Sequence, residues 1–229
     1  MIIKMIKQLL GYIGINYILS KTNINLSKNL YFNFLVFLHN VLLTVFSGYI
    51  FYRSCVIMDE SKFLEKFNFA SNLLMKRNDY HYITYLFYIS KYYEFVDTWI
   101  LYLKNKKARF LQIYHHIGAV INMRNIYVYR VEAGWIFVTF NSFVHTIMYI
   151  YYTFSTLKIY LPIKRLITTI QILQFVFGLG LSSLYLLYNN TSKQNYHLQM
   201  FVNLYLCGLI VLFLDFANKT YRKKLNKKL

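Results

Sequence analysis

Six apolar segments, each of about 20 residues, dominate this sequence. Each is long enough to cross about 30 Å of hydrocarbon as an α-helix. The core of a soluble domain could not bury six such segments in a chain of 229 residues. We therefore predict an all-α polytopic membrane protein with a single domain over residues 1–229. The expected spans are about 31–53, 80–103, 110–129, 133–154, 166–188 and 196–217.

A seventh apolar segment, residues 2–19, carries Lys4 and Lys7. This pattern is compatible with a short first span and with a helix that lies in the membrane interface, so the bundle is expected to have six to seven transmembrane helices. No small-residue cleavage site follows the apolar run, which argues against a signal peptide.

The chain has a formal net charge of +18, from 26 Lys and Arg against 8 Asp and Glu. In a membrane protein such an excess of cations either marks the cytosolic side or indicates contacts with anionic lipids or phosphorylated ligands. We therefore expect the lipid bilayer as a partner and no nucleic acid. Six spans place four basic segments, with 15 of the cations, on one side: 20–30, 104–109, 158–165 and the tail 218–229.

The basic side is predicted to be cytosolic, which makes residues 218–229 a basic cytosolic tail. The opposite side holds eight Lys and Arg. It also holds two overlapping N-x-[ST] triplets, at Asn189 and Asn190, where glycosylation would take place.

Ionisable residues interrupt the second span, 80–103. Lys91, Glu94, Asp97 and Thr98 fall within one arc of about 120° on a helix. Charged groups in a membrane are costly, so this stripe is expected to face the bundle interior and to serve a function. The alternative is an ion pair between Lys91 and Glu94 that only fixes helix packing.

Three further spans also carry polar residues on one face. Counted along each helix at 1.5 Å per residue, they lie about 8 to 20 Å from the basic side, in the same layer as the stripe of the second span. Polar residues that served packing alone would have no reason to share a depth. The sequence therefore predicts a polar chamber open to the cytosol. These residues are Gln112, His115, His116, Asn141, His145, Tyr149, Tyr152, Gln171 and Gln174.

Several kinds of chemistry fit this composition poorly. Six histidines are few for a di-iron membrane oxygenase, and the adjacent His115 and His116 diverge by about 100°, which disfavours a zinc site with His145. There is no G-x-S-x-G motif for serine acyl transfer. Cys55 and Cys207 have no histidine near them in sequence. Histidine as nucleophile or base remains, and no metal is expected.

The polar residues occur in ordered motifs. KYYEFVDT (91–98), QIYHH (112–116), NSFVHTIMYIYY (141–152) and TTIQILQF (168–175) follow one another, flanked by LHN (38–40) and LFLDFANKTYRKK (212–224). With these motifs the chain resembles the ELO family of very-long-chain fatty acid elongases. It departs from the family at Gln112, where a histidine is usual, and in its short first span.

The resemblance implies a seven-span protein of the endoplasmic reticulum membrane that condenses a long-chain acyl-CoA with malonyl-CoA. The products are a 3-oxoacyl-CoA, CO2 and CoA. No cofactor is implied beyond these substrates. The reductases and dehydratase of the elongation cycle, and a second copy in a homodimer, are the partners it suggests. A transporter or channel for an anionic lipid or nucleotide is the alternative, although the chain shows no inverted repeat.

The proposed roles divide the candidate residues into three sets. In one mechanism His115 attacks the acyl thioester and Asp97 orients the ring of His115. In the other the histidines act only as acids and bases in a direct condensation. The acyl tail would lie between apolar spans, walled by Phe175 and Phe177. The catalytic set is His115, His116, His145, Asp97, Gln112 and Asn141. The substrate-binding set is Lys91, Glu94, Thr98, Tyr149, Tyr152, Gln171 and Gln174. The set for CoA phosphates is Lys104, Lys106, Lys107, Arg109, Lys164 and Arg165.

Overall fold

The computed structural model describes residues 2–61, 73–188 and 191–222, and within them it is helical with no named strand. Asn189, Asn190 and the last seven residues of the predicted tail lie outside the described residues. The helices are α1 (Ile2–Lys21), α2 (Leu30–Glu60), α3 (Leu73–Lys76), α4 (Asn78–Tyr93), α5 (Phe95–Leu103), α6 (Phe110–Tyr129), α7 (Gly134–Thr156), α8 (Lys164–Tyr188) and α9 (Lys193–Ala217), followed by a π-helical turn (Asn218–Arg222).

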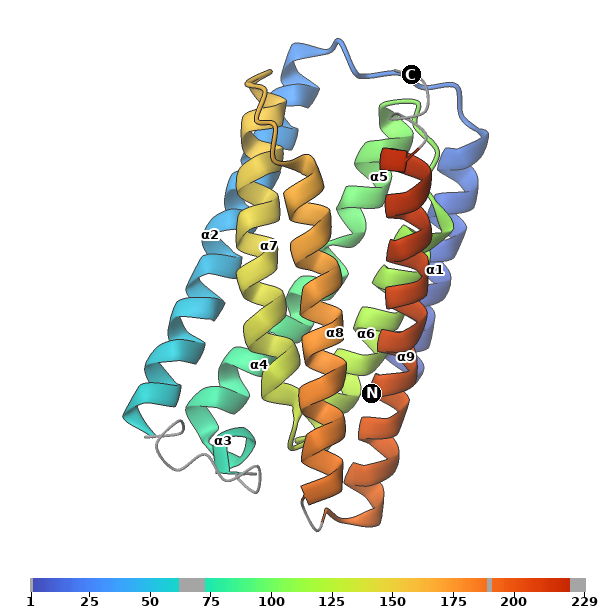
Figure 1. Ribbon diagram of the computed structural model, residues 1–229. Coiled ribbons are helices and arrows are strands. Elements are labelled where there is room, and N and C mark those ends of the chain that lie inside the picture. The colour runs from blue at the N-terminus through green and yellow to red at the C-terminus, as the bar shows by residue number, and fades with distance from the viewer. Residues whose placement is uncertain (1, 62–72, 189–190, 223–229) are drawn as a thin grey trace.

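The long helices run side by side along one axis and alternate in direction (Figure 1). Within the described part of the chain, α1, α2, α8 and α9 with its following turn are long and apolar enough to cross a membrane. The predicted spans 110–129 and 133–154 are the helices α6 and α7, whose polar residues lower their mean hydropathy. Segment 2–19 is fully helical, as α1.

The predicted span 80–103 is not one continuous helix. It divides into α4 and α5 at Glu94, which caps both segments with φ −62° and ψ −13°. Neither glycine nor proline lies near this break, so the sequence gives no local signal for it. Glu94, which is 2% exposed, therefore lies at the joint between the two helical segments.

Two glycines allow α6 and α9 to approach each other closely. A Cβ atom at Gly118 would lie 2.1 Å from the ring of Tyr205, and one at Gly208 would lie 2.3 Å from the hydroxyl of Tyr114. Only glycine leaves room for these two aromatic rings. The close contact brings Tyr205 of α9 up to the backbone of α6 at His115.

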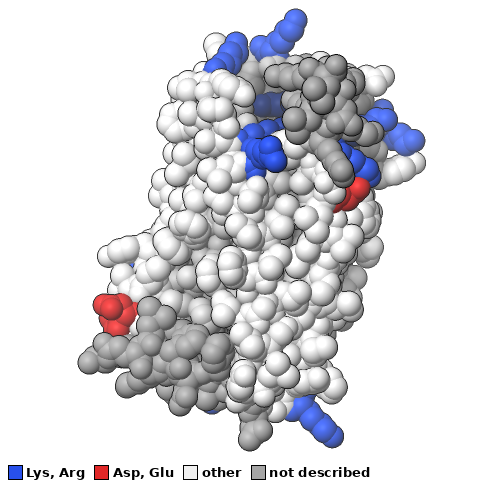
Figure 2. Space-filling model, viewed as in Figure 1, with Lys and Arg blue, Asp and Glu red and all other residues white. Residues whose placement is uncertain are grey.

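The described parts of the four basic segments, 20–30, 104–109, 158–165 and 218–222, meet at one end of the bundle, the upper end in Figures 1 and 2. The amide of Leu26 donates to the carbonyl of Leu103 at 2.8 Å. Arg109 donates to Thr220 at 3.4 Å, and the hydroxyl of Tyr221 donates to the carbonyl of Lys164 at 3.2 Å. The predicted grouping of the basic segments is confirmed for their described residues. On the face shown in Figure 2 the middle of the bundle carries almost no charge.

The outer surface is apolar along the length of the bundle, with large side chains such as Leu35, Leu204 and Val211 exposed. Phe177 belongs to this surface, since it is 60% exposed. The prediction that Phe177 walls an internal space is therefore wrong. Phe175, two residues earlier and on the opposite face of α8, is 3% exposed and does line an internal cavity.

Candidate active site

A buried ion pair forms the base of the site. Lys91 and Glu94 are 1% and 2% exposed, and the ammonium of Lys91 lies 2.7 Å from Oε1 of Glu94. The same ammonium donates to Oδ1 of Asn141 at 2.9 Å, which ties α4 to α7. A buried ion pair is stable only with good geometry and further hydrogen bonds, because both charges have left water. Here Asn141 supplies one of these bonds.

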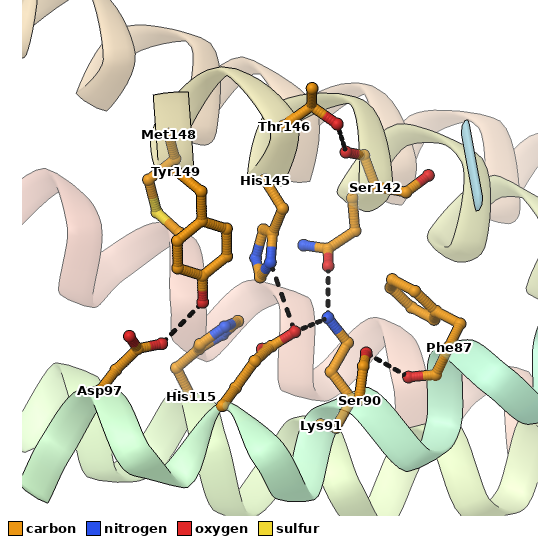
Figure 3. Close-up of polar contacts among 12 residues, drawn as sticks. Phe87, Ser90, Lys91, Asp97, His115, Ser142, His145, Thr146, Met148 and Tyr149 are labelled. Carbon is orange, nitrogen blue, oxygen red and sulfur yellow. Dashed lines mark hydrogen bonds and ion pairs between the residues drawn. The ribbon is translucent and has the colours of Figure 1, made fainter. Parts of the chain in front are cut away.

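Two histidines face each other above this ion pair. The ring centroids of His115 and His145 lie 6.3 Å apart, and Nδ1 of His145 lies 3.5 Å from Oε1 of Glu94. Figure 3 shows the side chains of Lys91, His115 and His145 converging on one space between α4, α6 and α7. His145 is buried, whereas His115 keeps part of its surface accessible.

Tyr205 fixes the ring of His115. Its hydroxyl donates to the backbone carbonyl of His115 at 2.9 Å and lies 3.3 Å from Nδ1 of the same residue. Because the hydroxyl proton is used at the carbonyl, the hydroxyl oxygen can accept only a proton carried by Nδ1. This arrangement assigns the tautomer with hydrogen on Nδ1 and leaves the lone pair of Nε2 free. Tyr205 was not among the residues singled out from the sequence.

Asp97 does not orient His115, contrary to our expectation. Its Oδ1 lies 2.9 Å from Nε2 of His39, and its Oδ2 accepts a hydrogen bond from Tyr149 at 2.6 Å. Both carboxylate oxygens are therefore engaged by α2 and α7. The ring of Tyr149 packs edge-on against His145, with centroids 5.6 Å apart, so Asp97 is connected to the histidine pair through Tyr149.

His39, like Tyr205, is a residue of the site that sequence reasoning missed. Besides binding Asp97, its Nδ1 lies 3.2 Å from the hydroxyl of Tyr93. The available signal is the LHN motif at residues 38–40, from which the sequence alone predicts no role. Because α2 and α5 are far apart in the chain, no helical spacing could have paired these two residues.

Thr98, Gln112 and His116 form a second group beside the site. Oγ1 of Thr98 accepts from Nε2 of Gln112 at 3.1 Å and lies 2.9 Å from the hydroxyl of Tyr12 in α1. His116 points to the same side, against Tyr12 and Phe95, with ring centroids 6.2 Å away in each case. Its Nδ1 has no partner within the described residues. The predicted divergence of His115 and His116 is confirmed.

The remaining predicted substrate residues lie at the edges. Gln171 donates to the sulfur of Met148 at 3.3 Å, and the ring of Tyr152 packs against Tyr149 with centroids 6.0 Å apart. Gln174 lines a separate narrow cavity between α7, α8 and α9, whose lining contains none of the histidines. From their depth along the helices these residues were expected in one layer, but in the structure Gln174 does not line the space of the histidine pair.

The six cations expected to bind phosphates all lie at the basic end. Five of them are exposed, namely Lys106, Lys107, Arg109, Lys164 and Arg165. The guanidinium of Arg109 lies 4.6 Å from the ring centroid of Phe216. Burial, and then the charge of Lys106, lower the pKa of Lys104 from its usual value. The exposed lysines are therefore the side chains most available to bind a phosphate.

One group could be considered for a metal ion. Ligand atoms of Glu94, His115 and His145 lie within 4.8 Å of one another. However, Oε1 of Glu94 already binds the ammonium of Lys91, and a cation placed there would face that charge directly. The three side chains thus fit an ion pair beside two histidine bases better than they fit a zinc site. The ligand atoms of a zinc site would lie closer to one another.

Comparison with known proteins agrees with the motifs. The model of the ELO family, described as GNS1/SUR4 family, matches residues 2–229. Relatives include the fatty acid elongase sre1 of Dictyostelium discoideum, 39% identical over 48% of this chain and 41% of the relative. Fatty acid elongase A of the same organism is 31% identical over 61% of this chain and 54% of its own length.

Very long chain fatty acid elongase 5 of Xenopus laevis is 33% identical over 62% of this chain and 50% of its own length. The chain thus spans about half the length of the curated relatives it matches. Because the family model covers almost every residue, including the facing histidines, the ion pair and the basic end, this chain belongs to the ELO (GNS1/SUR4) family.

Proposed function

We propose that this protein is a fatty acid elongase that condenses a long-chain acyl-CoA with malonyl-CoA to give a 3-oxoacyl-CoA, CO2 and CoA. The observation that carries the proposal is the facing pair of His115 and His145, held between a buried ion pair and Tyr205. The membership in the ELO family and the names of the relatives support the same reaction.

We further propose seven membrane spans, with α4 and α5 together forming the third. The basic end then faces the cytosol, as an excess of Lys and Arg favours, and the C-terminus lies there as well. The endoplasmic reticulum is the expected membrane. The polar cluster becomes a chamber entered from the cytosolic side, where Lys106, Lys107, Lys164 and Arg165 are available to the phosphates of CoA.

His115 is the proposed nucleophile because its Nε2 is free and part of its surface is accessible. Nε2 forms a bond to the thioester carbonyl carbon, and the bond from that carbon to sulfur breaks. The acyl-imidazolium formed in this way loses its Nδ1 proton to solvent, and the CoA thiolate takes up one proton, so the step balances. The result is an acyl-imidazole and free CoA.

Malonyl-CoA then completes the reaction. Loss of its carboxylate as CO2 leaves an enolate, whose carbon attacks the acyl group while the bond to Nε2 breaks. The imidazole recovers one proton from solvent, so the whole reaction consumes one proton. In this proposal His145 and Asn141 bind the thioester oxygen on which the enolate charge develops. The 3-oxo product is a substrate for a reductase, which agrees with reductases and a dehydratase as partners.

Purified protein incubated with acyl-CoA and malonyl-CoA tests the function. We expect a product two carbons longer, detected by mass spectrometry, and no such product from His115→Ala. His197→Ala, which removes an exposed histidine outside the site, is the matched control and should keep full activity. Transport of an anionic lipid into vesicles without any new product would instead support the alternative of a transporter.

A further inference from the structure

The ammonium of Lys91 is fully engaged by the protein. It donates to Oε1 of Glu94 at 2.7 Å and to Oδ1 of Asn141 at 2.9 Å, and it lies 3.9 Å from the ring centroid of Phe87. An ammonium has three N–H donors and no acceptor, so these three contacts use its whole capacity. Lys91 is also only 1% exposed. Any part that it takes in the reaction must therefore go through a neighbouring side chain.

The contact with Lys91 fixes the orientation of the amide of Asn141. Because an ammonium only donates, the amide atom that faces it is the oxygen, which assigns the two ends of the amide. The nitrogen Nδ2 is then turned away from Lys91 and remains a donor. It has no hydrogen-bond partner among the described residues, and it is not enclosed in the way that Oε2 of Glu94 is. Asn141 is 2% exposed, and a buried donor requires a partner.

The side chain of Asn141 belongs to the group around the two histidines. Asn141 and His145 are four residues apart on α7 and share one face of the helix. The ion pair contacts both of them, since Oε1 of Glu94 also lies 3.5 Å from Nδ1 of His145. A contact that only held α4 against α7 would use the amide oxygen and leave the nitrogen unexplained. The nitrogen therefore offers an uncharged N–H donor to a ligand in the site.

We propose, resting on the elongase function above, that Lys91 is a positioning residue that holds the amide nitrogen of Asn141 toward the thioester oxygen of malonyl-CoA. Loss of CO2 leaves negative charge on this oxygen, and a donor that is already oriented stabilises it without reorganisation. If the amide turned over, its oxygen would face the same charge and repel it. The carboxylate of Glu94 keeps the buried ammonium paired, so that Lys91 continues to hold the amide.

Asn141→Asp separates this role from helix packing. Aspartate has nearly the same shape and still offers an oxygen to Lys91, so α4 and α7 remain joined, but its carboxylate has no N–H donor. The full-length protein in lipid nanodiscs is supplied with acyl-CoA and malonyl-CoA. We expect kcat to fall about a hundredfold, as on removal of one oxyanion donor, while KM for both substrates and the unfolding temperature change little. Asn141→Ala should lose kcat to a similar extent and serves as the second variant if the aspartate variant does not fold.

Ser142→Ala is the matched control. Ser142 is adjacent and fully buried, but its hydroxyl donates to the carbonyl of Val138 in its own helix at 2.7 Å, so kcat should be unchanged. A kcat near that of the wild type in folded Asn141→Asp, or in folded Asn141→Ala, would overturn the inference.

A double-mutant cycle tests whether Lys91 acts through Asn141. Lys91→Met together with Glu94→Gln should lower kcat at least about tenfold more in the presence of Asn141 than in the Asn141→Ala background. The loss of the contact between Glu94 and His145 is the same in both backgrounds and cancels. Additive effects would overturn the positioning role of Lys91. A wild-type protein that forms no elongated product would instead overturn the proposed function.

Discussion

His39 and Asp97 form a histidine–carboxylate pair, with 2.9 Å between Nε2 and Oδ1, although 57 residues of chain separate them. The pair joins α2 to α5, and Tyr149 of α7 binds the other carboxylate oxygen at 2.6 Å. Three helices that contribute to the site are thus fixed to one another by a single carboxylate. The ring of Tyr149 in turn contacts that of His145.

His39→Ala should therefore impair catalysis without removing any group that touches substrate. Without His39, Asp97 loses one of its two partners and Tyr149 is held less firmly against His145. We expect kcat to fall by about tenfold or more while KM for both CoA substrates changes little, which is the signature of lost transition-state positioning. Steady-state kinetics with His197→Ala as the control measure this. A higher KM with unchanged kcat would contradict a positioning role.

Lys91 and Glu94 are expected to depend on each other for stability. Lys91→Met or Glu94→Gln alone leaves one buried charge without its partner, which costs about 3–5 kcal/mol. The double variant removes both charges and should regain most of the lost thermal stability, measured by unfolding in detergent. Its activity should remain low, because His145 also uses the carboxylate of Glu94. Equal destabilisation in the double variant and the single variants would contradict a coupled pair.

Much of this arrangement could be predicted from helical periodicity. The spans 110–129 and 133–154 coincide with α6 and α7 to within two residues, because apolar runs and helix lengths are properties of the local sequence. The stripe from Lys91 to Thr98 faces inward for the same reason. The break at Glu94 could not be predicted, since neither glycine nor proline lies near it.

Contacts between helices were the harder part. Depth along the axis placed Asp97 and His115 in one layer, but depth gives no information on which helices are neighbours. The carboxylate of Asp97 instead meets His39 and Tyr149. Gln174 is a second example, since it was expected at the depth of the histidines but lines a different cavity.

Gly118→Ala should disturb both packing and activity. The added Cβ would lie 2.1 Å from the ring of Tyr205, so α6 and α9 would have to separate or the ring would have to move away from His115. We expect a loss of about 1–3 kcal/mol of stability from overpacking, measured by thermal unfolding, together with reduced condensation. Gly180→Ala is the matched control, because nothing lies within 4 Å of its Cβ position. Unchanged stability of Gly118→Ala would argue against the close contact.

An acyl adduct on His115 is the direct test of the two-step mechanism. Enzyme supplied with acyl-CoA alone should release CoA and gain the mass of the acyl group, mapped by peptide mass spectrometry to residue 115. His145→Ala should still form the adduct if its role is confined to the second step, whereas His115→Ala should form none. Release of CoA only when malonyl-CoA is also present would favour direct condensation in a ternary complex.

The cations of the basic end provide the last prediction. Lys106, Lys107 and Arg109 are all exposed, but Arg109 also packs on Phe216 and donates to Thr220. Neutralising the two lysines should therefore remove phosphate contacts without disturbing the fold. We expect Lys106→Gln with Lys107→Gln to raise KM for at least one CoA substrate several-fold and to leave kcat nearly intact, as loss of uniform binding does.

The effect should also be weaker at high salt, because exposed charges are screened. Lys193→Gln removes an exposed cation at the opposite end and is the control. Arg109→Gln is expected to differ from the lysine pair by lowering thermal stability as well, since its stacking contact is lost. If KM for both substrates is unchanged in the double lysine variant, the phosphates of CoA must bind elsewhere at this end, with Lys164 and Arg165 as the next residues to neutralise.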